Sequence, residues 1–413
     1  MIMVRSHPRI SEGNFFLKRL LNVSTAPAAG GNGCGIGFAL TPSQTELQQR
    51  VRSFIRDRVI PLERECVQDR TSHGPSRALR DRLVALGKQE GLYTHQLRYD
   101  STVTRGIVLE ESGYSTLGPI ALGVQAPDEG NAHLMSVIAT EPQKRKYLDK
   151  LLDGTWTSCF CMTEPSPGAG SDPRAIKTTA TPVDGSLEQF RINGKKWLIT
   201  GANEAGFCIV MAVVPDKGAT MFLSKMDAPG IKLTRTLDTM DSSFFGGHSV
   251  VEFQDVKVSK EDVLGEIGKG LEYAQVRLAP ARLTHCMRWL GAATRCHDEA
   301  TKYAINRESF GKPIIDHQGV SFQLADNVID LHACRLMVWH CAWFLDQVKT
   351  HAEHNEARRI SSMCKVFVSE KLYSIADRSL QVMGGLGVTD DAEVQRIFRD
   401  LRAFRVYDGT SEV

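Results

Sequence analysis

Hydrophobic residues recur at helical spacing from about residue 41 onward. In "TPSQTELQQRVRSFIRDRVIPL" the apolar side chains fall on one stripe, which is typical of a helix that buries one face. Ser43 and Glu46 have the spacing of an N-terminal capping box, and Pro61 is expected to end this helix. "SRALRDRLVALGKQEGL" and "EPQKRKYLDKLLDG" show the same period. Residues 41–155 are therefore predicted to form an N-terminal helical domain.

The pattern changes at about residue 156. Short runs such as "FRINGKKWLITG", "GFCIVMAVVP" and "HSVVEFQDVKVS" are rich in Val, Ile, Phe and Thr, and Gly, Asp or Pro turns separate them. Runs of this length and composition indicate strands that succeed one another closely along the chain. Residues 156–260 are predicted to form a middle β-domain, built as an antiparallel barrel or sandwich.

Long helical patterns then return and continue almost to the end of the chain. They are too long and too apolar on one face to be stable alone, and four of them favour a helical bundle over residues 265–413. The predicted helices are 267–305, 316–348, 356–385 and 391–404. Alternating β-α units are not seen, which argues against a doubly wound dinucleotide-binding domain. The predicted fold class is mainly α with a middle β-domain.

The composition excludes some classes of function. The 413 residues include 50 Lys and Arg against 48 Asp and Glu, so the formal net charge is +2, which gives no electrostatic case for nucleic acid or an anionic membrane. Apolar runs stay well short of the roughly 18 residues of a membrane span. Ten scattered cysteines favour buried free thiols in a reducing compartment. His332 and His340 have no acidic or thiol partner at ligand spacing, so we expect core histidines and no metal site.

The first residues differ from the rest. Residues 1–34 carry four Arg or Lys and one acidic residue, Glu12, and they end in small residues and glycines. This composition is typical of a mitochondrial transit peptide, and the alternatives are a disordered leader or a wrongly assigned start. Residues 1–40 are set apart as a leader. The expected location is mitochondrial, and otherwise cytoplasmic or peroxisomal.

Four motifs could carry chemistry, although each has a plain structural explanation. "CMTEPSPGAGSD" (161–172) is a loop whose exposed backbone N–H groups suit a polar ligand. "NGKKWLITGA" (193–202) is a strand with an aromatic residue and a hydroxyl. "NRESFGKPIIDHQGVSFQLAD" (306–326) carries an arginine suited to phosphate, or merely a solvated charge. "QVMGGLGV" (381–388) allows close backbone approach, or is simply a helix C-cap.

Taken together and in this order, the motifs resemble the acyl-CoA dehydrogenases, flavoenzymes that desaturate acyl-CoA thioesters. The resemblance runs from about residue 41 to the end and rests on "MTEP....GSD", "NGKKW.IT", "R.SFGKPI..HQ..SF.LAD", "Q..GG.GV" and the final "YDGTSEV". It implies FAD as cofactor, an acyl-CoA substrate, electron-transfer flavoprotein as electron acceptor, and a homodimer or homotetramer. The implied fold has an N-terminal helical domain, a β-domain and a C-terminal four-helix bundle.

The resemblance also implies roles for particular residues. Met162, Thr163 and Leu198 match positions beside the flavin ring, and Thr200 matches the hydroxyl near flavin N5. Ser171 matches a residue that contacts both cofactor and substrate, and Arg282 and Gly409 match substrate-binding positions. Further FAD-binding positions, the first four of which resemble residues supplied by a neighbouring subunit, are Arg307, Ser309, Gln381, Gly385 and Thr410.

Asp408 occupies the motif position where most of the family has a glutamate base. That base removes the α-proton of the thioester while the β-hydride moves to flavin N5. Some relatives place the base just before the bundle arginine, but Ala281 stands there. Aspartate is one methylene shorter than glutamate, about 1.5 Å of reach. A family branch resembling mammalian members ten and eleven carries this aspartate and shares "QAPDEGN" (125–131), and it is linked to long-chain, branched and 4-hydroxy acyl-CoA substrates.

Several departures leave other functions open. Leu198 stands where many relatives have a tryptophan, with Trp197 one place earlier, and the segment "GLYTHQLRYDSTVTRGIVLEE" is shorter than in relatives. Nitroalkane oxidases resemble this family, also use an aspartate base and pass electrons to oxygen. A non-catalytic FAD-binding scaffold is a third possibility, because relatives usually continue past "GTSEV" into a further helix, which the bundle is expected to lack. The "YDGT" ending and Arg282 favour the dehydrogenase.

Overall fold

The computed structural model describes residues 39–93, 98–99 and 101–413, so the predicted leader lies outside the described residues. The chain divides into two compact units, 1–46 and 47–413. The described part of the first unit begins helix α2 (Pro42–Phe54). Thr41, not Ser43, caps this helix: Gln44 N donates to Thr41 Oγ1 at 3.2 Å, and Thr41 N donates to Gln44 Oε1 at 3.0 Å. The predicted capping box was therefore placed two residues too late.

Helices also dominate the chain between residues 47 and 152. The helix does not end at Pro61: a π-helical turn (Ile55–Val59) leads directly into α3 (Ile60–Glu65), whose first turn contains the proline. A proline is tolerated there because the first turn of a helix has no partner for its N–H. The other elements are β1 (Arg70–Thr71), β2 (Gly74–Pro75), α4 (Arg77–Gln89), α5 (Thr102–Gly113), α6 (Gly118–Leu122), α7 (Asp128–Ile138), α8 (Glu141–Gln143) and α9 (Asp149–Leu152).

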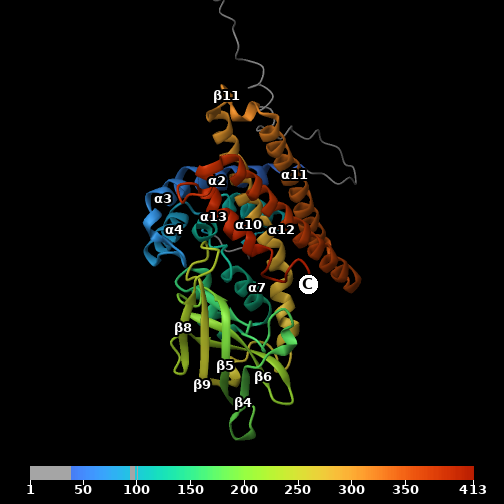
Figure 1. Ribbon diagram of the computed structural model, residues 1–413. Coiled ribbons are helices and arrows are strands. Elements are labelled where there is room, and N and C mark those ends of the chain that lie inside the picture. The colour runs from blue at the N-terminus through green and yellow to red at the C-terminus, as the bar shows by residue number, and fades with distance from the viewer. Residues whose placement is uncertain (1–38, 94–97, 100) are drawn as a thin grey trace, which may run out of the picture. The chain divides into compact units, whose positions relative to one another are not determined.

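A seven-stranded sheet follows, in the order β3-β6-β4-β5-β9-β8, with β7 paired to β6. Figure 1 shows β4, β5, β6, β8 and β9 as neighbouring strands. Most pairings are antiparallel, as expected, but β3 and β4 pair with β6 in parallel, which the alternation of residues did not reveal. The strands are β3 (Ser158–Cys161), β4 (Thr179–Pro182), β5 (Gln189–Thr200), β6 (Phe207–Val214), β7 (Gly218–Lys225), β8 (Ile231–Leu237) and β9 (His248–Ser259).

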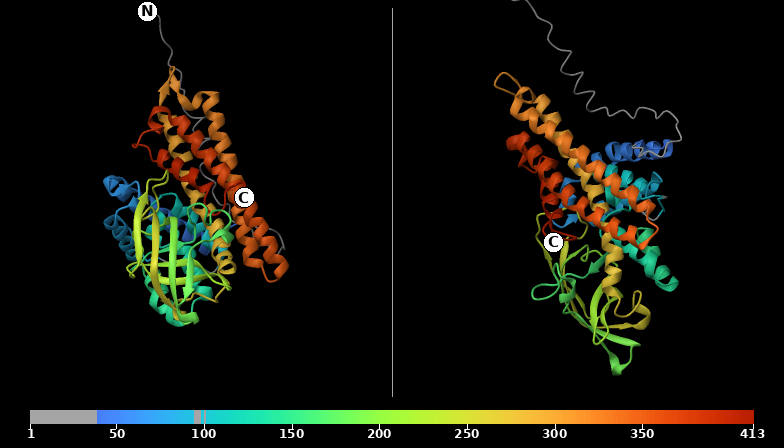
Figure 2. Two further views of the ribbon diagram at one scale, coloured as in Figure 1. Left: turned by 60° about the horizontal axis from the view of Figure 1, so that its bottom comes forward. Right: turned by 90° about the vertical axis from the view of Figure 1, so that its right-hand side faces the viewer.

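The predicted bundle is present, and its helices lie within a few residues of the predicted bounds. They are α10 (Gly270–Asn306), α11 (Gln318–Gln347), α12 (His351–Gly387) and α13 (Glu393–Phe404). The right-hand view of Figure 2 shows the long helices of the bundle running alongside one another. A hairpin of β10 (Glu308–Ser309) and β11 (Lys312–Pro313) joins α10 to α11. One apolar core extends from α2–α6 into the bundle helices, which fixes the bundle against the N-terminal helices.

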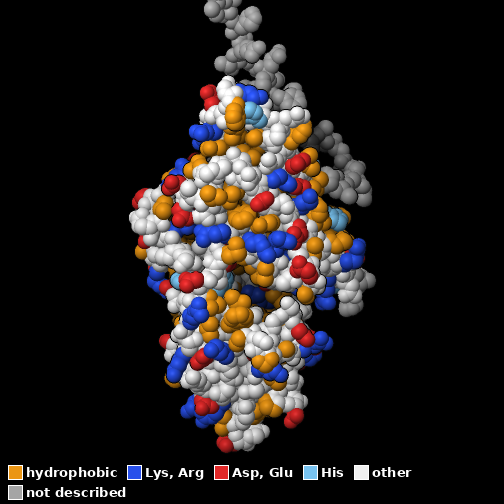
Figure 3. Space-filling model, viewed as in Figure 1, with side chains coloured by type: hydrophobic (Ala, Val, Ile, Leu, Met, Phe, Trp, Pro, Cys, Tyr) orange, Lys and Arg blue, Asp and Glu red, His pale blue; other side chains and the backbone are white. Residues whose placement is uncertain are grey.

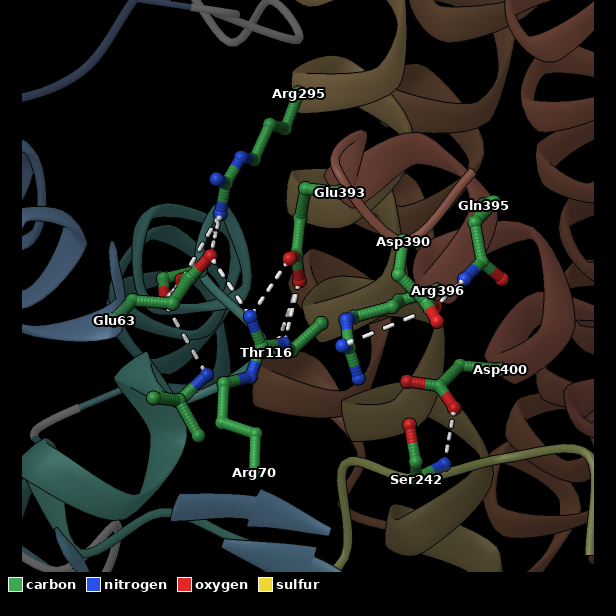
Figure 4. Close-up of polar contacts among 12 residues, drawn as sticks. Glu63, Arg70, Thr116, Ser242, Arg295, Asp390, Glu393, Gln395, Arg396 and Asp400 are labelled. Atoms are coloured by element: carbon green, nitrogen blue, oxygen red, sulfur yellow. Dashed lines mark hydrogen bonds and ion pairs between the residues drawn. The ribbon is translucent and has the colours of Figure 1, made fainter. Parts of the chain in front are cut away.

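Buried ion pairs join these two helical regions (Figure 4). Arg295 of α10 lies 2.9 Å from Glu63 of α3, and Arg70 of β1 lies 2.7 Å from Glu393, the first residue of α13. The four side chains are at most 9% exposed. Charges this deeply buried are tolerated only when each has a partner, so the network fixes the relative placement of α3, α10 and α13.

The thiols lie where the sequence predicted, whereas two histidines do not. The nine cysteines in the described part of the chain are buried and form no disulfides. His332 and His340, in contrast, lie on the exposed face of α11, so the expectation of core histidines was wrong. Over the described residues, helices as long and apolar as a membrane crossing requires are not found.

Candidate active site

The segment that follows α13 is anchored to the bundle by hydrogen bonds to its backbone. Arg282 of α10 donates from Nε to the carbonyl oxygen of Asp408 at 3.0 Å, and Lys365 of α12 donates from Nζ to the carbonyl of Gly409 at 2.6 Å. One residue earlier, Trp289 donates from Nε1 to the hydroxyl of Tyr407. Three consecutive residues are thus held by side chains of two different helices, so this segment has a defined position.

Asp408 has a special backbone conformation and a mostly buried side chain. Its φ is +56°, in the left-handed region, which aspartate adopts more readily than most residues. Its side chain is 17% exposed, and Oδ2 lies 3.3 Å from Nε2 of His285 on α10. Burial alone would raise the pKa of this carboxyl above its ordinary value. The His285 contact and the guanidinium groups of Arg277 and Arg282 oppose burial and bring the pKa down to about 2.

The loop after β3 is fixed to β5 by a buried ion pair. Lys196 donates from Nζ to the carbonyl of Met162 at 3.1 Å and to Glu164 Oε1 at 2.8 Å. The backbone N–H of Trp197 donates to the carbonyl of Thr163 at 3.0 Å. The first two predicted motifs therefore meet, and the predicted flavin neighbours Met162 and Thr163 lie directly beside β5.

Thr200, the last residue of β5, belongs to a chain of polar groups. Its hydroxyl lies 3.0 Å from Nδ1 of His248, whose Nε2 lies 2.8 Å from Asp241 Oδ2. Although burial works against it, the His248 contact lowers the pKa of Asp241 below its ordinary value, so Asp241 is ionised at neutral pH and accepts a hydrogen bond from Nε2. This arrangement fixes the orientation of the hydroxyl that the resemblance matches to a position near flavin N5.

Phe244 connects the Thr200 region to the Asp408 region. Its ring centroid lies 5.6 Å from that of His248 and 6.1 Å from that of Tyr407, and both contacts are edge-on. Figure 3 shows this face hollowed between the strands and the helices, with basic and hydrophobic side chains around the hollow, and in Figure 1 the chain ends beside it. The strand residues and Asp408 therefore belong to one site.

The surface formed by β5 and the loop after β3 suits a flat, partly polar ring. Trp197 and Leu198 are 37% and 44% exposed, and a register shift between Lys196 and Ile199 gives Leu198 a φ of +55°. Ser171, in the loop after β3, is exposed. An apolar platform beside backbone groups and hydroxyls is the environment that a flavin ring requires, so these residues fit FAD.

Four predicted FAD residues are not brought to this site. Arg307 follows the end of α10, about 36 Å along the helix from Arg282 at about 1.5 Å per residue. Ser309 lies in the adjoining hairpin, and Gln381 and Gly385 lie near the end of α12. Arg307, Gln381 and Gly385 are exposed. One chain therefore assembles the site around Asp408 without them.

The remaining predicted residue and the missed residues lie close to Asp408 or β5. Thr410 is half-buried in the terminal segment and accepts a hydrogen bond from Val413 N at 3.2 Å. The prediction missed the side chains that fix the others, because they contribute contacts between distant segments. The one signal in the sequence was that Glu164 and Lys196, which are opposite in charge, stand inside the first two motifs. The missed residues are Glu164, Lys196, Asp241, Phe244, His248 and His285.

Comparisons with known proteins show the family to which this chain belongs. Models of the acyl-CoA dehydrogenase N-terminal, middle and C-terminal domains match residues 41–155, 159–256 and 268–413. The chain belongs to the acyl-CoA dehydrogenase family, as the resemblance predicted, and FAD is the cofactor of that family.

Individual relatives match over most of this chain. "Acyl-CoA dehydrogenase family member 11" of Gallus gallus is 34% identical and covers 89% of this chain, which spans 49% of that relative. "Probable acyl-CoA dehydrogenase FadE2" of Mycobacterium tuberculosis is 33% identical, with 91% of this chain and 94% of the relative covered. The solved butyryl-CoA dehydrogenase of Megasphaera elsdenii has a TM-score of 0.78 and 28% identity, over 91% of this chain and 97% of that one.

Proposed function

We propose that this protein removes two hydrogens from the α and β carbons of an acyl-CoA thioester, with Asp408 as the base. Asp408 takes the α-proton, and the α,β carbon–carbon double bond forms as the β-hydride leaves. Bound FAD supplies the acceptor of that hydride. The substrate thereby loses one proton to the carboxylate and one hydride to the flavin.

The observation that carries this proposal is the state of Asp408. A pKa of about 2 keeps the carboxylate ionised at neutral pH, as a general base requires. The side chain lies in a mostly buried position, where a bound thioester would remove the remaining water and raise its basicity. Ala281, at the alternative position for the base just before Arg282, has no ionisable group.

The other residues hold the reactants. Met162, Thr163, Leu198 and Thr200 would contact the flavin, and Ser171 would lie between cofactor and substrate. The backbone N–H of Asp408 would stabilise the negative charge that develops on the thioester carbonyl oxygen. The long distance from Arg282 to Arg307 supports a second copy of the chain supplying Arg307, Ser309, Gln381 and Gly385, as a homodimer or homotetramer would.

A small cavity beside His285 supports a substrate class. Its volume is about 40 Å³, and its walls combine apolar groups such as Ile120, Phe245 and Trp289 with the polar Gln125 and Arg288. A cavity of this volume has room only for a small group of the substrate, and its mixed lining suits a polar substituent such as a hydroxyl. The relatives similar to this chain include family members eleven and ten. We propose fatty, branched or 4-hydroxy acyl-CoA substrates, electron-transfer flavoprotein as acceptor, and a mitochondrial location in fatty acid β-oxidation.

The test is anaerobic mixing of the purified flavoprotein with straight, branched and 4-hydroxy acyl-CoAs. We expect one class to bleach the flavin absorbance, and Asp408→Asn to lose that bleaching by on the order of 100-fold or more while it keeps its flavin. Asparagine also tolerates the left-handed backbone, so this variant should fold. Bound flavin that no thioester reduces would overturn the proposal. Oxygen consumption with a nitroalkane would then favour the oxidase, and inertness toward both would favour the scaffold.

A further inference from the structure

The carboxylate of Asp408 has one deeply buried oxygen. Oδ2 is excluded from solvent, and in the described part of the chain it accepts no well-aligned hydrogen bond. Nε2 of His285 lies 3.3 Å from Oδ2, within hydrogen-bond reach, and a small rotation of the carboxylate as the substrate binds would bring the two into line. A buried carboxylate oxygen without a donor is costly, so the character of this one contact decides how Asp408 is held.

The contact of His285 Nδ1 shows which ring nitrogen of this histidine carries the proton. Arg288 Nη2 lies 3.1 Å from His285 Nδ1, and a guanidinium can only donate, so Nδ1 is the acceptor. Burial, with Arg288 adding to it, lowers the pKa of His285 below its ordinary 6.5, which makes the ring neutral at neutral pH. A neutral ring with an accepting Nδ1 carries its proton on Nε2, the atom that faces Asp408.

Arg288 is itself fixed, so this tautomer is built into the fold. Its Nη1 donates to the carbonyl of Val124 at 3.0 Å and pairs with Glu129 of α7. Rings also pack around His285, with the centroid of Tyr407 at 4.9 Å. The charged and titratable groups near the Asp408–His285 pair are Glu129, Arg277, Arg282, Arg288, Lys365 and Tyr407.

We propose that His285 is a positioning residue for the base: as a neutral Nε2–H donor oriented by Arg288, it holds one oxygen of Asp408 and leaves the other to face the substrate. The contact compensates for the short side chain of aspartate, because a carboxylate held at one oxygen loses less of its orientation to rotation about χ2. This inference rests on the proposed role of Asp408 as the base.

Two amide substitutions separate the two ring nitrogens. His285→Asn places an acceptor where Nδ1 stands, so it keeps the partner of Arg288, but it is too short to reach Asp408. His285→Gln places an N–H donor where Nε2 stands, so it keeps the partner of Asp408. Flavin content and thermal unfolding identify any variant that fails to fold, and the comparison then rests on the other variant and the wild type.

The first readout is exchange of the thioester α-proton in D₂O across pH, which follows the base alone. In His285→Asn, loss of the donor should raise the pKa of Asp408 and move the acid limb of the profile up by on the order of one pH unit. The exchange rate below that limb should fall about tenfold. His285→Gln should bring the limb back toward the wild-type position. Coincident profiles for all three proteins, or an equal shift in both variants, would overturn the proposal.

The second readout does not depend on activity. In protein labelled with ¹⁵N-histidine, the His285 signals, assigned by their loss in His285→Asn, should show the neutral Nε2–H form at pH 7 and should move in Asp408→Asn. An Nδ1–H form or a doubly protonated ring would overturn the proposal. If the wild type exchanges no α-proton, the proposed function fails, whereas these signals still decide whether His285 donates to Asp408.

Discussion

Lys196 Nζ lies 2.8 Å from Glu164 Oε1, and the two side chains are 0% and 2% exposed. Glu164 also accepts hydrogen bonds from the backbone of Lys177 and Thr178, so this pair holds the loop of residues 161–172 against β5. We predict that Lys196→Met leaves a buried charge without its partner and lowers the free energy of unfolding by about 3–5 kcal/mol. Urea unfolding at pH 7 measures this change.

The pH dependence of that loss provides an internal control. Although burial opposes it, Lys196 and Thr178 hold the pKa of Glu164 at about 2, below its ordinary 4.5. In the wild type this contribution is present above the ordinary pKa and is lost as pH falls toward 2. In Lys196→Met, Glu164 becomes easier to protonate, so the difference from wild type should shrink between pH 7 and 4. A constant difference would contradict a charge-based role.

Asp400 of α13 should make the protein lose stability as pH rises from about 4 to 7. Burial, together with the nearby charge of Asp241, raises the pKa of Asp400 from 3.8 to about 7. A carboxyl whose pKa is raised by folding contributes stability that is fully present below the unfolded pKa and is lost as pH rises from the unfolded to the folded pKa. Between about pH 4 and 7 the wild type should therefore lose about 1.4 kcal/mol of unfolding free energy per pH unit from this group, and above pH 7 the slope should level off.

Asp400→Asn should remove that slope. The amide oxygen can still accept from Ser242 N, which lies 2.7 Å from Asp400 Oδ1 (Figure 4), while the titrating group is gone. Urea unfolding at pH 5, 6 and 7 should show a flatter profile for this variant and a gain over wild type that is largest at pH 7. The exposed Asp391→Asn is the matched control and should follow the wild type. Parallel profiles for Asp400→Asn and wild type would show that Asp400 is ionised throughout.

The sequence predicted what depends on local patterns. Helical periodicity located the bundle, and apolar runs located the sheet, because burial of one face imposes those periods. Pro61 misled the helix prediction, since a π-helical turn before it moves the proline into a new first turn. The parallel pairing of β3 with β6 was missed because alternation in a strand does not depend on the direction of its neighbour.

Only the part of the candidate site that lies within local motifs was predicted from the sequence. Residues within motifs, such as Thr200 and Asp408, could be named from the resemblance. His285 and His248 could not, because their roles come from contacts with residues 123 and 48 positions away along the chain. A buried polar side chain finds its partner only when the tertiary structure forms, and no local pattern records that pairing.

Asp408→Glu tests whether the pocket is matched to aspartate. The extra methylene displaces the carboxylate by about 1.5 Å, and a displacement of about 1 Å can cost on the order of 100-fold in rate. Glutamate also tolerates the φ of +56° less well than aspartate does. We therefore expect bleaching by the best acyl-CoA to slow by about 100-fold, with flavin content unchanged. Restored or faster bleaching would mean that the site has room for the longer base.

Arg282→Lys distinguishes two roles of one side chain. Arginine donates from Nε to the carbonyl of Asp408, and a lysine ammonium keeps the charge but cannot reproduce that fixed donor. If Arg282 mainly anchors the terminal segment, amide hydrogen exchange over residues 405–413 should accelerate, and kcat should fall about tenfold with KM little changed. Arg282→Met, which removes the charge as well, should accelerate exchange to a similar extent. A rise in KM in Arg282→Met alone, with exchange unchanged in both variants, would instead assign the side chain to the CoA ester, because only the charge would then matter.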